Sequence, residues 1–400
     1  MPKEYSPFTP GQPVPIEFFV GRVDEVNRLK QASAESAAGR LRAMFLSGER
    51  GIGKSSLASF VRFLAERDHQ LLGLHTFLGG VDSLEEMVRR VFDRLLNESI
   101  GKAWHEKVRG FFGNHIRQVG LFGVSVQFGE AGKDLPPMVY DFVPALRRLV
   151  ERLRDDKKGI LLILDDINGL ASVASFANWL KSLVDEISTS HEPLPLCLVL
   201  VGLEDRRQSL IANQPSLARV FNLVDIRPWT ETETSDFFQK AFDKVGVPVE
   251  ESALRALTRY AGGLPVLAHE IGDATFRIDQ DSSIGESDAV AGVISAADIV
   301  GRKYLEPQVF QALRSTRYRA ILRKAAVDEP IGMSFHRRDL LKRLSDDEAK
   351  VTDNFLRRLK KLGVLRSDPE GGPGAYRFDN LLHKVYFWME ANRAYASPQP

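Results

Sequence analysis

Residues 48–56 have the types and spacing of a loop that holds phosphate groups. The stretch fits the pattern G-x-x-x-x-G-K-[ST]. Its glycines allow backbone N–H groups to turn inward, and a helix that starts behind them adds partial positive charge. Lys54 is expected to reach the β- and γ-phosphates, and the Ser55 hydroxyl to complete a Mg²⁺ shell. The sequence therefore predicts that ATP and Mg²⁺ bind at Gly48, Glu49, Arg50, Gly51, Ile52, Gly53, Lys54, Ser55 and Ser56.

A second chemical signal lies at residues 159–166. A run of branched apolar residues there ends in two carboxylates, Asp165 and Asp166. Such a run suits a central parallel strand that is buried on both faces, and ligands bind beyond the carboxyl ends of such strands. Asp165 is expected to hold Mg²⁺, directly or through water. Asp166 is expected to orient or activate the attacking water, so Lys54 and Asp166 are candidate catalytic residues.

The elements that must position these residues follow from the hydrophobic pattern. Apolar runs at residues 41–46, 70–78, 159–164 and 196–202, with a further strand through Ile226, predict the strands of a parallel sheet. Helical spacing follows the loop from Ser55 onward. The fold class expected is therefore α/β, with a parallel sheet that carries the nucleotide loop.

Composition shifts divide the chain into four parts. Five prolines in residues 1–18 predict an extended arm. We expect an ATPase domain at 19–228, a small helical lid at 229–298 and a separate module at 299–395. Alternating residues near 122–128 predict a hairpin inserted within 101–136. That hairpin is either an edge cover for the core or a partner contact.

The last hundred residues are basic, although the whole chain has a net charge of only +1. Residues 301–400 carry 20 Lys and Arg against 12 Asp and Glu. An arginine-rich helix, a helix at 336–344, a third that opens with a capping box at Ser345, and two short strands predict a winged helix-turn-helix. The outward basic residues are candidates for DNA contact. They are Arg357, Arg358 and Lys361 on the third helix, and Arg366 and Arg377 on the strands.

Several classes of protein are disfavoured. No apolar run approaches the length of a membrane span, and the N-terminus lacks an apolar signal core. A single cysteine, Cys197, cannot form an internal disulfide. A cytoplasmic protein without membrane contact is expected. The eight histidines show no metal-binding spacing and are expected to be structural or surface residues.

With these motifs in place, the chain resembles AAA+/STAND-type P-loop ATPases. The likeness is to the origin-recognition-like, archaeal-ATPase and transposition-targeting branch, and it covers nearly the whole length. Phe19 and Val20, with Gly21 and Arg22, are similar to the box that lines the adenine pocket there. Residues 263–265 resemble the GxP motif, which implies that Pro265 packs near the nucleotide. Arg219 falls where relatives carry an arginine that reaches a neighbouring subunit, which implies ATP-dependent homo-oligomers.

The chain also departs from this pattern. Asp166 stands where fast hydrolases have glutamate, so slow turnover is expected, and the sensor residue would be Glu204 or Asp205. Arg219 is open to a plain surface role, and Pro265 to the start of a helix. Two functions therefore stand. One is a DNA-associated ATPase; the other is a STAND switch whose winged helix regulates the nucleotide state, with a separate effector protein.

Overall fold

The computed structural model describes residues 5–12, 19–112, 116–119, 126–128, 141–310, 315–326 and 334–396. The backbone divides into two compact units. The first spans residues 13–227, and the second combines residues 1–12 with 228–400. The chain therefore passes between the units twice. In the described part of the chain, no helix combines the length and apolar character that a membrane crossing needs.

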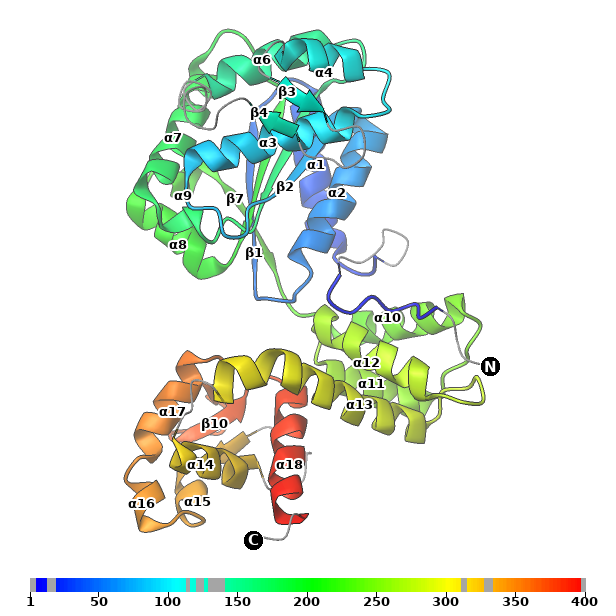
Figure 1. Ribbon diagram of the computed structural model, residues 1–400, viewed down its shortest axis with the longest axis vertical. Coiled ribbons are helices and arrows are strands. Elements are labelled where there is room, and N and C mark those ends of the chain that lie inside the picture. The colour runs from blue at the N-terminus through cyan, green and yellow to red at the C-terminus, as the bar shows by residue number, and fades with distance from the viewer. Residues whose placement is uncertain are drawn as a thin grey trace. The chain divides into compact units, whose positions relative to one another are not determined.

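A parallel sheet forms the centre of the first unit (Figure 1). It has five strands in the order β2-β5-β6-β1-β7. All five predicted strands are present. Strands β5 and β6 consist entirely of buried residues, which is why they read as unbroken apolar runs. The strands are β1 (Arg42–Gly48), β2 (Leu71–Phe77), β5 (Gly159–Asp165), β6 (Leu196–Gly202) and β7 (Asn222–Ile226).

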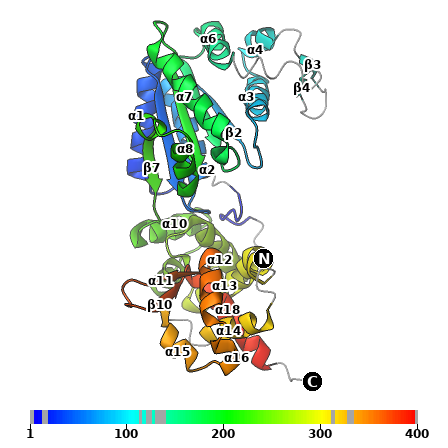
Figure 2. The same ribbon diagram turned by 90° about the vertical axis from the view of Figure 1, so that its left-hand side faces the viewer.

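Helices cover both faces of this sheet (Figure 2). Helices α1 (Val23–Ala37) and α2 (Lys54–His69) lie on one face, and α3 (Leu84–Ser99), α6 (Phe142–Leu153) and α7 (Ala174–Thr189) on the other. Shorter helical segments complete the unit: α4 (His105–Phe112), η3 (Leu170–Ser172), α8 (Glu204–Asn213) and α9 (Leu217–Val220).

The alternation of side chains along a strand decides which residues meet which helices. In β5, Ile160, Leu162 and Leu164 join the core under α3, α6 and α7. Asp165 is offset by one residue and therefore belongs to the face that α1 and α2 cover. The same rule places His75 of β2 on the α2 face, because Leu72 and Leu74 join the opposite core.

The segment predicted as an inserted hairpin contains two short antiparallel strands. They are β3 (Ile116–Val119) and β4 (Val126–Phe128), which pair with a register shift. A strand was expected at residues 122–128. Residues 122–125 lie outside the described part of the chain, and residues 126–128 form β4.

In the second unit, four helices form the segment expected to be a lid, and the N-terminal arm packs against them. Phe8 is 3% exposed. Its ring centroid lies 5.8 Å from that of Phe237 and 5.0 Å from that of Phe242, in edge-to-face contacts. Such pairs contribute about 0.5–1.5 kcal/mol each beyond their buried area. The helices are α10 (Glu231–Lys244), α11 (Glu251–Ala261), α12 (Pro265–Ile278) and α13 (Glu286–Val300), so the expected boundary at residue 298 falls within α13.

A small winged-helix region follows the π-helical segment η4 (Gly301–Phe310). Its sheet has the order β8-β10-β9. The capping box at Ser345 is present, but the single helix expected from it is wrong. The box starts only a short helix, and α17 begins separately at Thr352. The elements are α14 (Thr316–Ala326), β8 (Ser334–His336), α15 (Arg337–Leu341), α16 (Asp346–Ala349), α17 (Thr352–Lys361), β9 (Leu365–Ser367), β10 (Ala375–Phe378) and α18 (Leu381–Ala396).

Candidate nucleotide site and basic surface

The phosphate loop lies between β1 and α2, as the sequence predicted. Gly51 and Gly53 have φ angles of 75° and 95°. L-residues with side chains rarely adopt such angles, so these positions need glycine. Ile52 is 1% exposed and anchors the turn. At Gly48, a Cβ atom would lie 2.9 Å from the Ile52 Cγ2 atom and 3.0 Å from the carbonyl oxygen of Ile226, so the loop packs tightly against the end of β7.

Lys54 is the first residue of α2, and its ammonium group is held over the loop. Nζ donates hydrogen bonds to the carbonyl oxygens of Gly48, at 2.9 Å, and Glu49, at 2.7 Å. Burial lowers the pKa of this ammonium, and the charges of Asp165 and Asp166 act against that change. The lysine and both predicted carboxylates therefore share one electrostatic site.

Asp165 ends β5 and is 2% exposed. Its Oδ2 atom lies 2.8 Å from Nε2 of His75, which is itself 2% exposed. The other ring nitrogen of His75, Nδ1, lies 3.2 Å from the Ser59 hydroxyl oxygen on α2. The expectation that every histidine is merely structural or at the surface therefore missed this contact. The available signal was a single imidazole beside the leucines of a predicted buried strand.

Asp166, by contrast, is exposed. It has a φ angle of 58°, a left-handed conformation that is uncommon for residues other than glycine. The amide of Asn168 donates to Oδ1 of Asp166, and the amide oxygen of Asn168 lies 3.4 Å from the backbone nitrogen of Leu203. Asn168 therefore ties Asp166 to the end of β6. The sequence analysis did not single out Asn168.

The residues present fit a magnesium ion. The Ser55 hydroxyl and the Asp165 carboxylate are hard oxygen ligands, and both belong to elements that meet at the loop. Among the described residues, no group of three or more His, Cys, Asp or Glu side chains could hold a metal. Mg²⁺ needs only one or two protein oxygens, because phosphate and water complete its shell.

The residues at the start of α1 are tied to the loop. Phe19 stacks on Phe60 of α2, with the ring centroids 4.4 Å apart and the planes at 8°. The guanidinium of Arg22 donates to the carbonyl oxygen of Ile52, at 3.2 Å, and to that of Arg227. Val20, next to Phe19 in the sequence, is half-buried. Ser56 is half-buried in the first turn of α2, and Glu49 and Arg50 are exposed.

Of the two candidate sensor residues, Glu204 is the one linked to the loop strand. Its Oε2 atom accepts a hydrogen bond from the hydroxyl of Ser47, at 3.1 Å, one residue before Gly48. Hydrogen bonds from Arg207 lower the pKa of Glu204. Asp205 instead lies beside the guanidinium of Arg206, with Nε 3.6 Å from the Asp205 Oδ2 atom.

For two predicted site residues, Arg219 and Pro265, the described contacts do not include one with the phosphate loop. Arg219 is exposed on the short helix α9. Pro265 is the first residue of α12 in the second unit, as a helix-starting proline would be. The turn before it is close-packed, because a Cβ atom at Gly263 would lie 2.3 Å from the carbonyl oxygen of Trp229. Both roles stay predictions.

The basic residues of the winged helix lie on a different kind of surface, which we call the α17–wing surface. Helix α17 buries Phe355 and Leu359 and exposes the basic side chains expected to contact DNA. Arg366 of β9 stands directly opposite Arg377 of β10. Burial raises the pKa of Asp379, against the pull of both arginines. The α17–wing surface consists of Arg357, Arg358, Lys361, Arg366 and Arg377.

The chain was compared with known proteins. None of the curated proteins is a significant match. Many solved structures are similar to this chain, and two of them match across most of their length. The Walker-type ATPase PABY2304 of Pyrococcus abyssi is 17% identical with a TM-score of 0.56, and the match covers 93% of this chain and 96% of that one. The ORC2 protein of Aeropyrum pernix, solved as ADPNP-ADP complexes, is 16% identical with a TM-score of 0.58, and the match covers 98% and 97%.

These likenesses confirm the fold. The family profile of the AAA ATPase domain matches residues 19–199, which contain the phosphate loop, Asp165 and Asp166. Residues 19–199 of this chain are therefore similar to AAA ATPase domains.

Proposed function

We propose that this protein binds ATP with Mg²⁺, hydrolyses it slowly, and assembles with further copies of itself in the ATP-bound state to act on DNA. One observation carries the nucleotide part. The Lys54 ammonium lies over the carbonyls of the phosphate loop, within the field of two carboxylates at the end of β5. A phosphate chain with its metal ion matches that arrangement of charges.

The roles of the side chains follow from this arrangement. Lys54 binds the terminal phosphates, and Ser55 and Asp165 supply oxygen ligands to Mg²⁺, which neutralises the phosphate charge when bound. Asp166 accepts the proton of the attacking water, and the Asn168 amide holds its carboxylate in place. Phe19 and Val20, which lie before α1 in the first unit, contact the nucleotide, and Pro265 keeps the nucleotide role that the GxP resemblance implies. Aspartate is shorter than glutamate, and Asn168 restrains Asp166 further, which supports slow turnover.

Arg219 is proposed to act across a subunit interface. Its side chain is exposed on α9, a short helix in the connection between β6 and β7. From there it is available to a neighbouring subunit. Mixing Arg219→Ala protein with Asp166→Asn protein tests this, since each variant is expected to be inactive alone. Recovered ATPase activity in the mixture supports a shared site. No recovery at any ratio would show that Arg219 acts within its own subunit or not at all.

The α17–wing surface is proposed as the DNA contact. In a helix-turn-helix, the recognition helix places its exposed face in the major groove. Here α17 takes that part, and its exposed face carries Arg357, Arg358 and Lys361. Arg366 and Arg377 add positive charge on the strands of the wing. Phosphate contacts of this kind make binding fall steeply with salt.

One observation favours the second function, a regulatory switch. Helix α18, which closes the winged-helix region, packs against α11 and α13 of the four-helix segment. A winged helix joined to the lid in this way would follow the lid when the nucleotide changes, with no need for DNA. A separately encoded effector would then receive the signal.

A single experiment separates these functions. The mass of the protein in solution is measured with ADP and with ADPNP, each with and without duplex DNA. The proposed function predicts a larger mass with ADPNP, and co-migration with DNA that is lost at high salt. A change of mass with ADPNP but no salt-sensitive DNA binding would favour the switch. No response to either nucleotide would contradict both.

A further inference from the structure

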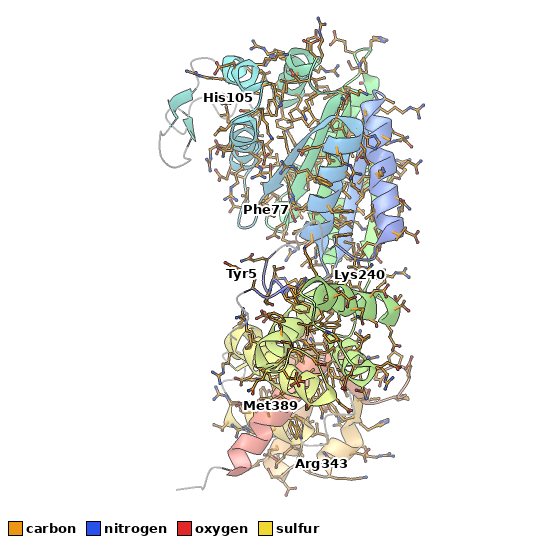
Figure 3. All side chains as sticks on the ribbon, turned by 90° about the vertical axis from the view of Figure 1, so that its right-hand side faces the viewer. Tyr5, Phe77, His105, Lys240, Arg343 and Met389 are labelled. Atoms are coloured by element: carbon orange, nitrogen blue, oxygen red, sulfur yellow. The ribbon has the colours of Figure 1, made fainter. Side chains whose placement is uncertain are left out.

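His75 takes part in a buried chain of hydrogen bonds that none of the roles above uses. The imidazole lies on β2, with Nε2 2.8 Å from Oδ2 of Asp165 and Nδ1 3.2 Å from the Ser59 hydroxyl oxygen. The side chains of His75 and Asp165 are 3% and 4% exposed. His75 also stacks on Phe77, with ring centroids 4.4 Å apart; Phe77 is labelled in Figure 3. Three adjacent elements, α2, β2 and β5, meet in this chain.

The direction of each hydrogen bond follows from the chemistry of the groups. An ionised carboxylate only accepts, so Nε2 of His75 carries the proton and donates to Asp165. In the neutral ring Nδ1 is then the acceptor, and the Ser59 hydroxyl donates to it. Ser59 lies one helical turn after Ser55 on α2. The chain of hydrogen bonds therefore starts one turn from the Ser55 hydroxyl and ends at the Asp165 carboxylate, the two protein groups expected to bind the metal.

The sheet register explains why these two residues meet. His75 pairs with Ile163 and Phe77 pairs with Asp165 across the two parallel strands. His75 and Asp165 are therefore diagonal neighbours on one face, within reach of a long side chain. Helix α2 covers that face, which brings Ser59 to the outer ring nitrogen and excludes water from the contact.

Resting on the proposed role of Asp165 at Mg²⁺, we propose that His75 is a positioning residue for that metal site. By occupying Oδ2, the imidazole fixes the carboxylate and leaves Oδ1 for the ion or its water. Outer groups that orient a metal ligand commonly change metal affinity 10- to 100-fold when they are replaced. Ser59 acts one step further out, by holding the ring in its orientation.

Two amide substitutions separate the metal role from simple packing. In His75→Gln the amide nitrogen takes about the place of Nε2 and still donates to Asp165. In His75→Asn the amide nitrogen takes about the place of Nδ1 and does not reach the carboxylate. Both variants keep a neutral polar group in the same buried position, so each is the matched control of the other.

The measurement is a Mn²⁺ titration followed by electron paramagnetic resonance, in the presence of saturating ADPNP. We expect His75→Asn to bind Mn²⁺ about 10-fold more weakly than the unmodified protein, and His75→Gln to remain within about 3-fold. ADPNP affinity in EDTA should be unchanged in both variants, because no metal is present in that arm. Thermal melting checks that each variant is folded.

The outcomes distinguish this inference from the proposed function. Equal Mn²⁺ affinities in the two variants, whether both preserved or both weakened, would overturn the positioning role. Failure of the unmodified protein to bind ADPNP both in EDTA and with Mn²⁺ would instead overturn the nucleotide site itself. If neither variant folds, Ser59→Ala decides. About 3-fold weaker Mn²⁺ binding supports the chain of hydrogen bonds, and unchanged binding overturns it.

Discussion

The phosphate-loop region and the α17–wing surface both concentrate chemistry, but they are constructed in opposite ways. At the loop, most of the important side chains are buried or half-buried and each has an assigned partner, such as His75 for Asp165 or a pair of carbonyls for Lys54. On the α17–wing surface the cations are mostly exposed, and two of them face each other across the strands. Ligand binding in the first region therefore depends on the exact positions of partnered side chains, and in the second on the total positive charge.

This difference determines how each region should respond to mutation. A buried, partnered site loses function sharply when one atom changes, since no neighbour can replace it. An exposed basic surface loses function gradually, because each cation contributes a similar, salt-screened increment. The variants below test that contrast, from the largest expected effect to the smallest.

Asp166→Asn should reduce ATP turnover about 100-fold or more, because the carboxamide cannot accept the proton of the attacking water. ADPNP affinity should stay within about 2-fold, since the carboxamide keeps the size of the side chain. Steady-state phosphate release and equilibrium binding measure the two quantities. The matched control is Asp155→Asn, at an aspartate that is 78% exposed. Equal turnover in the Asp166→Asn and unmodified proteins would show that Asp166 is not the base.

Lys54→Ala should weaken ATP binding by about 10- to 100-fold, since charge-assisted hydrogen bonds to the phosphates contribute about 1.5–3 kcal/mol. The fold should persist, because the partners of the ammonium are loop carbonyls that solvent can reach. Titration with a fluorescent ATP analogue measures the affinity. Lys102→Ala, at an exposed lysine of the same unit, is the control. Unchanged affinity and turnover in Lys54→Ala would remove the basis of the nucleotide assignment.

Replacing Arg357 and Arg358 together by Glu should weaken DNA binding about 10-fold at moderate salt and flatten the salt dependence by about two log-slope units. ATP affinity should not change. The control reverses two exposed arginines of the other unit, Arg109→Glu with Arg154→Glu, which alters the net charge equally. If the control pair weakens DNA binding as much, the effect belongs to the total charge and not to the α17–wing surface.

The smallest effect is expected at Asp353, on the first turn of α17. Its carboxylate forms a two-point ion pair with Arg337, at 2.7 and 3.0 Å, and lies in the field of Arg357. Asp353→Asn removes a negative charge beside the proposed DNA contact, so DNA affinity should rise about 2-fold. Fluorescence anisotropy with a labelled duplex is sensitive enough to detect this. A fall in affinity would indicate that Arg337 must be held by Asp353 for binding.

The sequence predicted the parts of the nucleotide site that depend on local spacing. The loop, the strand that precedes it and the paired Asp165 and Asp166 are each contained in one short stretch, and all were found where expected. The contact between His75 and Asp165 was missed because it depends on β2 lying beside β5, an adjacency that no local pattern encodes. Asn168 was missed for a similar reason, since its amide oxygen meets Leu203 at the end of a neighbouring strand.

The winged-helix region shows a different limit. The capping box at Ser345 was identified correctly, but the helix was expected to continue from it, because Val351 and Phe355 share a face. In the structure Val351 precedes α17 as its N-cap, so the periodic pattern spans two short helices joined by a turn. Apolar periodicity reports which residues are buried, and two successive helices can bury residues with the spacing of one.

The two passages of the chain between the units have a mechanical consequence. Here the first passage follows the arm that Phe8 anchors in the second unit. The second begins at Arg227, whose carbonyl oxygen shares the Arg22 guanidinium with the phosphate-loop carbonyl of Ile52. A shift of that loop is therefore passed through Arg22 to Arg227, the last residue of the first unit before the chain enters the second.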